Sequence, residues 1–222
     1  MQLPEQPKAG AGRESGPWLL FLSSVEVRFG TVLSNPSRIF HMDVPDPILK
    51  SGSLIVRRVE QSDIRLLTRW LSTNEVLAFY GGRDKPYDAG RISEEFFQRD
   101  GIIRCIVEWE GVPIGYIQFY RCEPKENLDY GFATTESVWG MDQFIGETGY
   151  WNKGIGSRLV REMAEYLLSR GAAHVVTDPE TWNTRAIRAY QKAGFLKVKL
   201  LPRHEWHEGE MRDSWLMEYK RT

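Results

Sequence analysis

The 222-residue sequence lacks the features that mark several specialised classes of protein. It has only two cysteines, Cys105 and Cys122, and their spacing fits neither a metal site nor a disulfide framework. No apolar run approaches the ~20 residues that span a bilayer, and the N-terminal region has no secretory signal pattern. A formal net charge of -1 argues against a nucleic-acid-binding surface. We therefore expect a cytoplasmic protein with no membrane or nucleic-acid partner.

The remaining composition is that of an ordinary globular protein, with 41% hydrophobic and 12% aromatic residues. Residues 1–53 hold six of the eleven prolines and no sustained hydrophobic period. We expect this segment to be a poorly ordered extension, with one domain over residues 54–222. Because Met42 precedes the regular pattern, an upstream translation artefact over residues 1–41 is an alternative.

From residue 54 onward the hydrophobic pattern alternates between strand and helix periods. Strands are predicted over residues 54–59, 103–109, 112–120, 138–145, 174–177, 195–200 and 214–219. Helices are predicted to begin near Ser62, Asn74 and Asp88, to run from the glycine loop to about Ser169, and to span residues 184–193. This order predicts an α/β fold, of the α+β kind with a mixed central sheet, and helices on both faces of the sheet.

The stretch Tyr-Trp-Asn-Lys-Gly-Ile-Gly-Ser at residues 150–157 runs directly into a helical pattern. A glycine loop that opens a helix can direct several backbone N–H groups and the helix dipole at an anion. The candidate phosphate-binding residues are Lys153, Gly154, Ile155, Gly156 and Ser157. Taken alone, this loop could equally be a tight turn.

A second segment, residues 183–195, strengthens the anion-site interpretation. Asn183 can cap a helix that carries Tyr190 and Lys192, and Gly194 ends that helix before an apolar strand. Together the two segments resemble the coenzyme A-binding motifs of the GNAT acyltransferase superfamily.

Further runs narrow the resemblance: Phe-Tyr-Gly-Gly-Arg-Asp-Lys at 79–85, Pro-Ile-Gly-Tyr at 113–116, Trp-Gly-Met-Asp-Gln-Phe-Ile-Gly-Glu at 139–147, and Arg-Ala-Ile-Arg-Ala-Tyr-Gln-Lys at 185–192. They resemble the aminoglycoside 6′-N-acetyltransferases, including the acetyltransferase half of a bifunctional acetyltransferase–phosphotransferase. The likeness covers residues 54–219 and implies the GNAT fold with acetyl-CoA as co-substrate. The residues expected to bind acetyl-CoA are Phe144, Ile145, Lys153, Gly154, Ile155, Gly156, Ser157, Asn183 and Lys192.

Trp151 departs from the superfamily pattern, which often has Gln or Arg three residues before the first glycine. The missing side-chain donor leaves Lys153 and the backbone amides to hold the pyrophosphate. Asn183 is expected either to contact the pantetheine arm or only to cap its helix.

Transfer of an acetyl group from a thioester to an amine needs a neutral amine, donors for the oxyanion and a proton for the leaving thiolate. The resemblance places Asp142 beside the thioester, as base or electrostatic anchor; a solvated strand-edge carboxylate is the alternative. Tyr190 is the candidate acid for the thiolate, with a core tyrosine as the alternative. A backbone N–H near Phe144 or Ile145 would supply the oxyanion donor.

Residues 123–147 carry six carboxylates against one base, Lys125. Most charge runs are solvated faces, but acids near the transfer strand would also attract a polycation. By resemblance, the sugar site is lined by Tyr80, Asp129, Asp142 and Asp178. His204 and His207 are expected to be loop residues, and no metal is predicted.

The leading expectation is a 6′-N-acetyltransferase that confers resistance to aminoglycosides by neutralising one ammonium group, acting as a monomer or homodimer. An acetyltransferase of a protein N-terminus or a polyamine is the second hypothesis, because both acceptors are cationic amines. A non-catalytic acyl-CoA-binding regulator is the third, although a pure binder would need neither Asp142 nor Tyr190.

Overall fold

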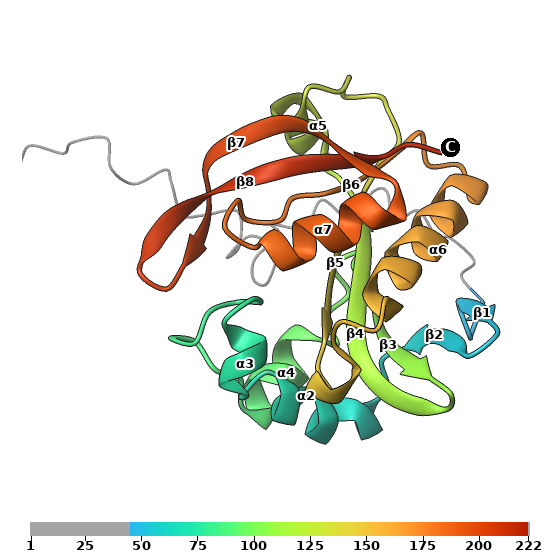
Figure 1. Cartoon of the computed structure of the whole chain (residues 1–222), viewed down its shortest axis with the longest axis vertical. Coiled ribbons are helices and arrows are strands. Elements are labelled where there is room, and N and C mark those ends of the chain that lie inside the picture. The colour runs from blue at the N-terminus through green and yellow to red at the C-terminus, as the bar shows by residue number, and fades with distance from the viewer. Residues whose placement is uncertain (1–44, 222) are drawn as a thin grey trace, which may run out of the picture.

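The computed structural model describes residues 45–221, which form one eight-stranded sheet with helices on both faces (Figure 1). The strand order is β1-β2-β3-β4-β5-β6-β8-β7. The strands are β1 (Leu49–Ser51), β2 (Leu54–Arg58), β3 (Ile103–Trp109), β4 (Val112–Arg121), β5 (Val138–Ile145), β6 (His174–Thr177), β7 (Phe195–His207) and β8 (Glu210–Tyr219). Among the strands of residues 45–221, only β5 and β6 pair in parallel, so the sheet is mixed and the predicted fold class is confirmed.

Two of the helices are long and amphipathic, and four are short. They are α2 (Ile64–Trp70), α3 (Asn74–Leu77), α4 (Ala89–Glu95), α5 (Pro124–Tyr130), α6 (Ile155–Ser169) and α7 (Thr184–Ala193). Helices α6 and α7 pack on one face of the sheet, and α2 to α4 lie on the other (Figure 1). Side chains alternate along a strand. Cys105 and Val107 of β3 therefore pack in the hydrophobic core under α6 and α7, and Ile106 packs in the core on the α2–α4 side.

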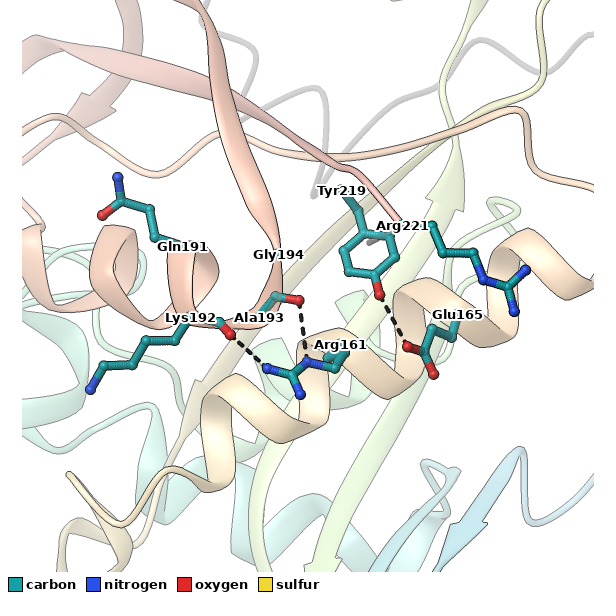
Figure 2. A pocket seen from close by; sticks show the side chains of 8 residues that line it. All are labelled: Arg161, Glu165, Gln191, Lys192, Ala193, Gly194, Tyr219 and Arg221. Atoms are coloured by element: carbon teal, nitrogen blue, oxygen red, sulfur yellow. Dashed lines mark hydrogen bonds between the residues drawn. The ribbon is translucent and has the colours of Figure 1, made fainter.

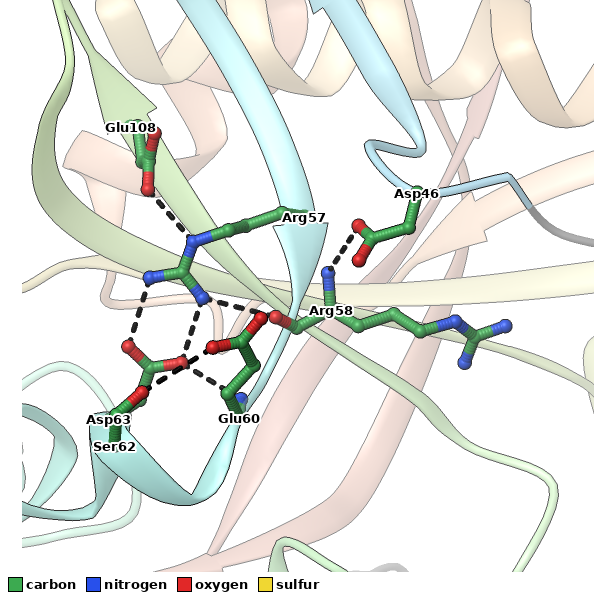
Figure 3. A network of polar contacts seen from close by, with 7 residues as sticks. All are labelled: Asp46, Arg57, Arg58, Glu60, Ser62, Asp63 and Glu108. Carbon is green, nitrogen blue, oxygen red and sulfur yellow. Dashed lines mark hydrogen bonds and ion pairs between the residues drawn. The ribbon is translucent and has the colours of Figure 1, made fainter.

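The first helical segment begins differently from the prediction. Ser62 is not its cap; a 3-10 turn (Gln61–Asp63) precedes α2, and Glu60 and Asp63 form a reciprocal capping box. Arg57 of β2 holds Asp63 with two hydrogen bonds of 2.8 and 2.9 Å and also donates to Glu108 (Figure 3). The carboxylate that caps the turn is thereby tied to the sheet.

Two elements lie where the sequence pattern predicted none, and two strands are longer than predicted. Strand β1 pairs with β2 and Ile48 is buried, so the domain begins before residue 54; the rest of the predicted extension, including the artefact hypothesis, lies outside the described residues. Helix α5 occupies the acidic stretch, starting with a proline and ending at Gly131. Strands β7 and β8 are longer than predicted because the hairpin continues past a register shift between Leu201 and Glu205.

None of the helices within residues 45–221 is long and apolar enough to cross a membrane.

Candidate functional site

Strand β5 continues past its parallel partner β6. The last parallel pair is Gly140 with Val176, and β6 ends at Thr177, with β8 paired along its other edge. Among the described strands, none covers the β6-side edge of β5 from Met141 to Ile145. Apart from the Ile145 carbonyl, which accepts from the Trp151 indole, backbone groups on that edge are therefore available to an extended ligand, as in other cases of strand addition.

A pocket opens at this separation of the strands, with a cavity volume of about 110 Å³. We call it the acidic pocket, because four carboxylates and no lysine or arginine line it. The lining residues with polar or aromatic side chains include Phe79, Tyr80, Asp142, Asp178, Glu180, Asn183, Tyr190 and Glu205. The structure thus brings together five residues that the sequence predicted for the site, from four separate segments.

Asp142 lies at the floor of the acidic pocket on β5, partly exposed. Its Oδ2 accepts a 2.8 Å hydrogen bond from the side-chain amide of Gln118 on β4, the residue directly opposite in the sheet. Tyr80 packs its ring on Phe144 at 4.8 Å, and its buried hydroxyl has no hydrogen-bond partner within the described residues. Burial raises the pKa of Tyr80 well above its usual value, so this hydroxyl stays protonated.

Tyr190 reaches the pocket from α7 and is 5% exposed. Burial raises its pKa, an effect that a hydrogen bond with Thr177 partly offsets. Its ring also packs against Phe195 at 5.5 Å. The core role and the pocket position, which the sequence left as alternatives, are therefore both present in one side chain.

Asp178 and Glu180 form the wall of the pocket after β6, and each pairs with a histidine. Asp178 accepts from Tyr130 at 2.8 Å and contacts His204 at 2.9 Å. Glu180 contacts His207 at 3.0 Å. The prediction that these histidines are loop residues is wrong, because both lie within strand β7, where they contact two of the pocket carboxylates.

Three of these wall groups, Asp178, His204 and Glu205, present ligand atoms within 4.8 Å of one another. Such a set could hold a metal ion. In the structure, however, Asp178 is hydrogen-bonded directly to the imidazole of His204. The absence of a metal from the function stays a prediction.

The glycine loop opens α6 as expected. Gly154 is the N-cap with φ 79°, a left-handed conformation that favours glycine. A Cβ on Gly154 or on Gly156 would meet nothing within 4 Å, so the space in front of the helix start is open to a ligand. Lys153 is exposed beside this loop, 5.2 Å from the Tyr150 ring.

Trp151 has a structural role and brings a cation to the loop. Its indole N–H donates to the Ile145 carbonyl at 2.8 Å. The Arg185 guanidinium lies 4.0 Å from the ring centroids of both Trp151 and Phe79. Partial burial lowers the pKa of Arg185, and no described carboxylate forms an ion pair with it. The sequence analysis did not predict Arg185 as a site residue, because no local pattern links residues 79, 151 and 185.

Lys192 lies elsewhere, at the C-terminal end of α7, in a groove between α6 and α7 with a volume of about 420 Å³ (Figure 2). Arg161 caps that end of α7 through the carbonyls of Lys192 and Ala193, and Tyr219 donates to Glu165 at 3.0 Å. Figure 2 shows the Lys192 side chain extending away from Tyr219 and Glu165. That Lys192 binds acetyl-CoA stays a prediction.

Asp129 is exposed on α5 and does not line the acidic pocket. The neighbouring residue, Tyr130, is the one that faces Asp178. Adjacent helical side chains point about 100° apart, so Asp129 is directed away. The pocket carboxylates that sequence reasoning did not place in the site are Glu180 and Glu205.

Comparisons with known proteins agree with this geometry. The sequence profile described as "Acetyltransferase (GNAT) domain" matches residues 59–202. The Klebsiella pneumoniae protein named aminoglycoside N(6′)-acetyltransferase type 1 is 29% identical over 150 residues, which are 65% of this chain and 75% of that protein.

Two solved structures are similar in fold. The structure of AAC(6′)-Ib with ribostamycin and coenzyme A has a TM-score of 0.59 at 25% identity, covering 76% of this chain and 94% of the other. A spermidine N-acetyltransferase from Vibrio cholerae, with coenzyme A and spermine, has a TM-score of 0.61 at 15% identity, covering 76% and 95%.

Proposed function

The chain belongs to the GNAT family of acetyltransferases, and we propose that it transfers the acetyl group of acetyl-CoA to the 6′-amine of aminoglycosides. The observation that carries the acceptor is the acidic pocket, in which four carboxylates surround the uncovered end of β5. Aminoglycosides are polycations, so a pocket lined by acids attracts them and speeds their encounter. The similarity to an aminoglycoside N(6′)-acetyltransferase supports the same choice.

The donor half of the site is the edge of β5 together with the loop that opens α6. The free N–H groups of Ile155, Gly156 and Ser157 would receive the pyrophosphate of acetyl-CoA, with Lys153 beside them. Arg185, stacked on Trp151, would replace the side-chain donor that this loop lacks. The pantetheine arm would then run along β5 toward Asn183, which also caps α7 by accepting from the Ala186 N–H at 3.1 Å.

The acceptor half is the acidic pocket itself. Its volume of about 110 Å³ is below the roughly 300 Å³ of a pocket that encloses a whole drug-sized ligand. Only the reacting amino sugar would therefore be enclosed, with the other rings outside. The buried Tyr80 hydroxyl would gain a partner from a sugar hydroxyl or amine, and Asp178 would meet a second cationic group.

Each reacting proton has a candidate residue. A sugar ammonium group resembles a lysine, with a pKa of about 10.4 in water, and must lose its proton before attack. Asp142 would accept that proton or stabilise the ammonium group before its loss, and a backbone N–H at Phe144 or Ile145 would stabilise the oxyanion. As the C–N bond forms and the C–S bond breaks, the Tyr190 phenol would give its proton to the sulfur, and the second proton lost by the nitrogen would restore the phenol. Acetyl-CoA supplies the thioester in this reaction.

The product explains a resistance function. Acetylation removes one positive charge from the drug, which weakens its binding to an anionic RNA target. The reaction would take place in the cytoplasm, where acetyl-CoA is available.

A panel of acceptors with acetyl-CoA, followed by the release of free thiol, tests the proposal. We expect turnover with kanamycin and with ribostamycin, and none with a matched analogue that bears a 6′-hydroxyl. Equal transfer to the 6′-amine drug and the 6′-hydroxyl analogue would exclude the 6′ position. Acetylation of spermidine or of peptides, with aminoglycosides left untouched, would exclude the aminoglycoside function and favour the second hypothesis.

A further inference from the structure

Gln118 is a buried polar residue that the reaction described above does not use. It is 1% exposed and lies between Arg104 on β3 and Asp142 on β5 in the register of the sheet. Its side-chain N–H donates to Asp142 Oδ2 at 2.8 Å. A glutamine is costly to bury unless its amide is hydrogen-bonded, so its contacts indicate why it is there.

The orientation of the Gln118 amide is set by a hydrogen bond to its oxygen, at the end opposite the NH₂ group. The Tyr116 hydroxyl donates to Gln118 Oε1 at 2.8 Å, and Tyr116 is fully buried. Burial raises the pKa of Tyr116 well above its usual value, so the phenol remains a donor at physiological pH. Because a donor occupies the oxygen end of the amide, the NH₂ end must face Asp142.

Arg104, Gln118 and Asp142 lie side by side across β3, β4 and β5, and Asp142 is the negatively charged residue of these three. Arg104 is engaged by Asp100 through two hydrogen bonds of 2.9 and 2.6 Å. The phenols near Asp142, those of Tyr80, Tyr116 and Tyr190, all have pKa values raised by burial and stay neutral. Asp178, on the opposite wall of the acidic pocket, is paired with His204.

We propose that Gln118 is a positioning residue, itself held by Tyr116, that orients the Asp142 carboxylate toward the acceptor amine. The inference rests on the proposed function, because it assigns the amine as the group that Asp142 meets. An amide suits this role, since it directs a carboxylate without neutralising its charge. An arginine or lysine in the same place would compete with the substrate ammonium group.

A double-mutant cycle separates positioning from packing. Gln118→Met keeps the volume and removes the donor, and Gln98→Met is the matched control at an exposed position on the α4 side. We expect Gln118→Met to lower kcat about tenfold, the scale of one hydrogen bond to a charged group. In an Asp142→Asn background, the same substitution should not lower kcat, because residues that act as a unit are non-additive. An equal factor in both backgrounds, or no effect in either, would overturn the proposal.

A second variant and a second measurement keep the test decisive. If Gln118→Met does not fold, Tyr116→Phe replaces it, because this change keeps the ring and frees the Gln118 amide to rotate. Unchanged kcat in Tyr116→Phe would reject the positioning role. If the wild type acetylates no aminoglycoside, the proposed function fails. The positioning role of Gln118 is then tested by the carboxyl ¹³C titration of Asp142, which needs no acceptor. A titration midpoint at higher pH in Gln118→Met or Tyr116→Phe than in the wild type supports this role, and an unchanged midpoint overturns it.

Discussion

Substitution of Asp142 by asparagine is the sharpest test of the proposed reaction. In the native protein, Gln118 donates to Asp142 Oδ2 at 2.8 Å. Asparagine has only one side-chain oxygen, and the fixed Gln118 donor would take it. The NH₂ group of the new residue would then point toward the acceptor, where a carboxylate oxygen stood. The substitution thus removes a negative charge and presents a donor to an ammonium group.

The size of the effect follows from these two losses. A hydrogen bond to a charged group contributes about 1.5–3 kcal/mol, and each 1.36 kcal/mol is about tenfold in rate. Loss of acid–base assistance alone costs about 10²-fold to 10⁴-fold. We therefore expect kcat/KM for the aminoglycoside to fall roughly 10²-fold or more. The KM for acetyl-CoA should stay within about twofold, because the phosphate site lies on another loop.

Thiol release with kanamycin, measured across the pH range, is the suitable assay. Glu94→Gln, an exposed carboxylate on α4, is the matched control and should behave as the wild type. If Asp142 accepts the proton directly, the acidic limb of the pH profile should disappear in the asparagine variant. Wild-type kcat/KM in Asp142→Asn at every pH would refute the role assigned to this residue.

Three further predictions concern other parts of the site. Tyr190→Phe should lower kcat about 10²-fold with little change in acceptor KM, because the phenol supplies the thiolate proton; unchanged kcat would leave it a core residue. Gly115→Ala should lower the free energy of unfolding by about 1–3 kcal/mol, since its Cβ would lie 2.4 Å from a β5 carbonyl. Thermal melts should detect this loss, and Gly149→Ala, with nothing within 4 Å, should melt as the wild type; equal melting would contradict the close approach. Arg185→Leu should raise the KM for acetyl-CoA about tenfold, on the scale of a charge-assisted hydrogen bond; the same KM as in the exposed control Arg188→Leu would argue against a phosphate contact.

The elements with strong local signals were predictable from sequence. Strands β3, β5 and β6 and helix α7 have the predicted bounds, because alternation, caps and glycine stops are properties of a short window. Where the alternating pattern of a strand is interrupted, the predicted strand ended too early. The bulged stretch around Pro202 and Arg203 broke the alternation of β7, although pairing with β8 resumes at Glu205. Strand β1 exists because β2 offers an edge, which a window of sequence does not record.

The site divides in the same way. The glycine loop was found from its pattern, and Asp142, Asp178 and Tyr190 from the resemblance; the structure brings the last three into one pocket. Asp129 lies outside the acidic pocket because one residue along a helix turns the side chain to another direction, and its role at the sugar site stays a prediction. Gln118 and Arg185 carry no motif of their own. Gln118 gains a role through Asp142 on β5, and Arg185 gains one through Trp151; both partners lie far away in sequence.

The sequence by itself therefore determined the family, the acetyl donor and the presence of acids near the transfer strand, since these depend on local spacing and composition. Only the tertiary structure decided which acids meet. Strand β5 continues past its last pair with β6, where the pocket opens, and the long strand β7 adds Glu205 to its lining and brings two histidines to Asp178 and Glu180. The physical reason is that charge focusing and carboxylate orientation depend on distances between segments, which the register of the sheet sets and a linear pattern does not contain.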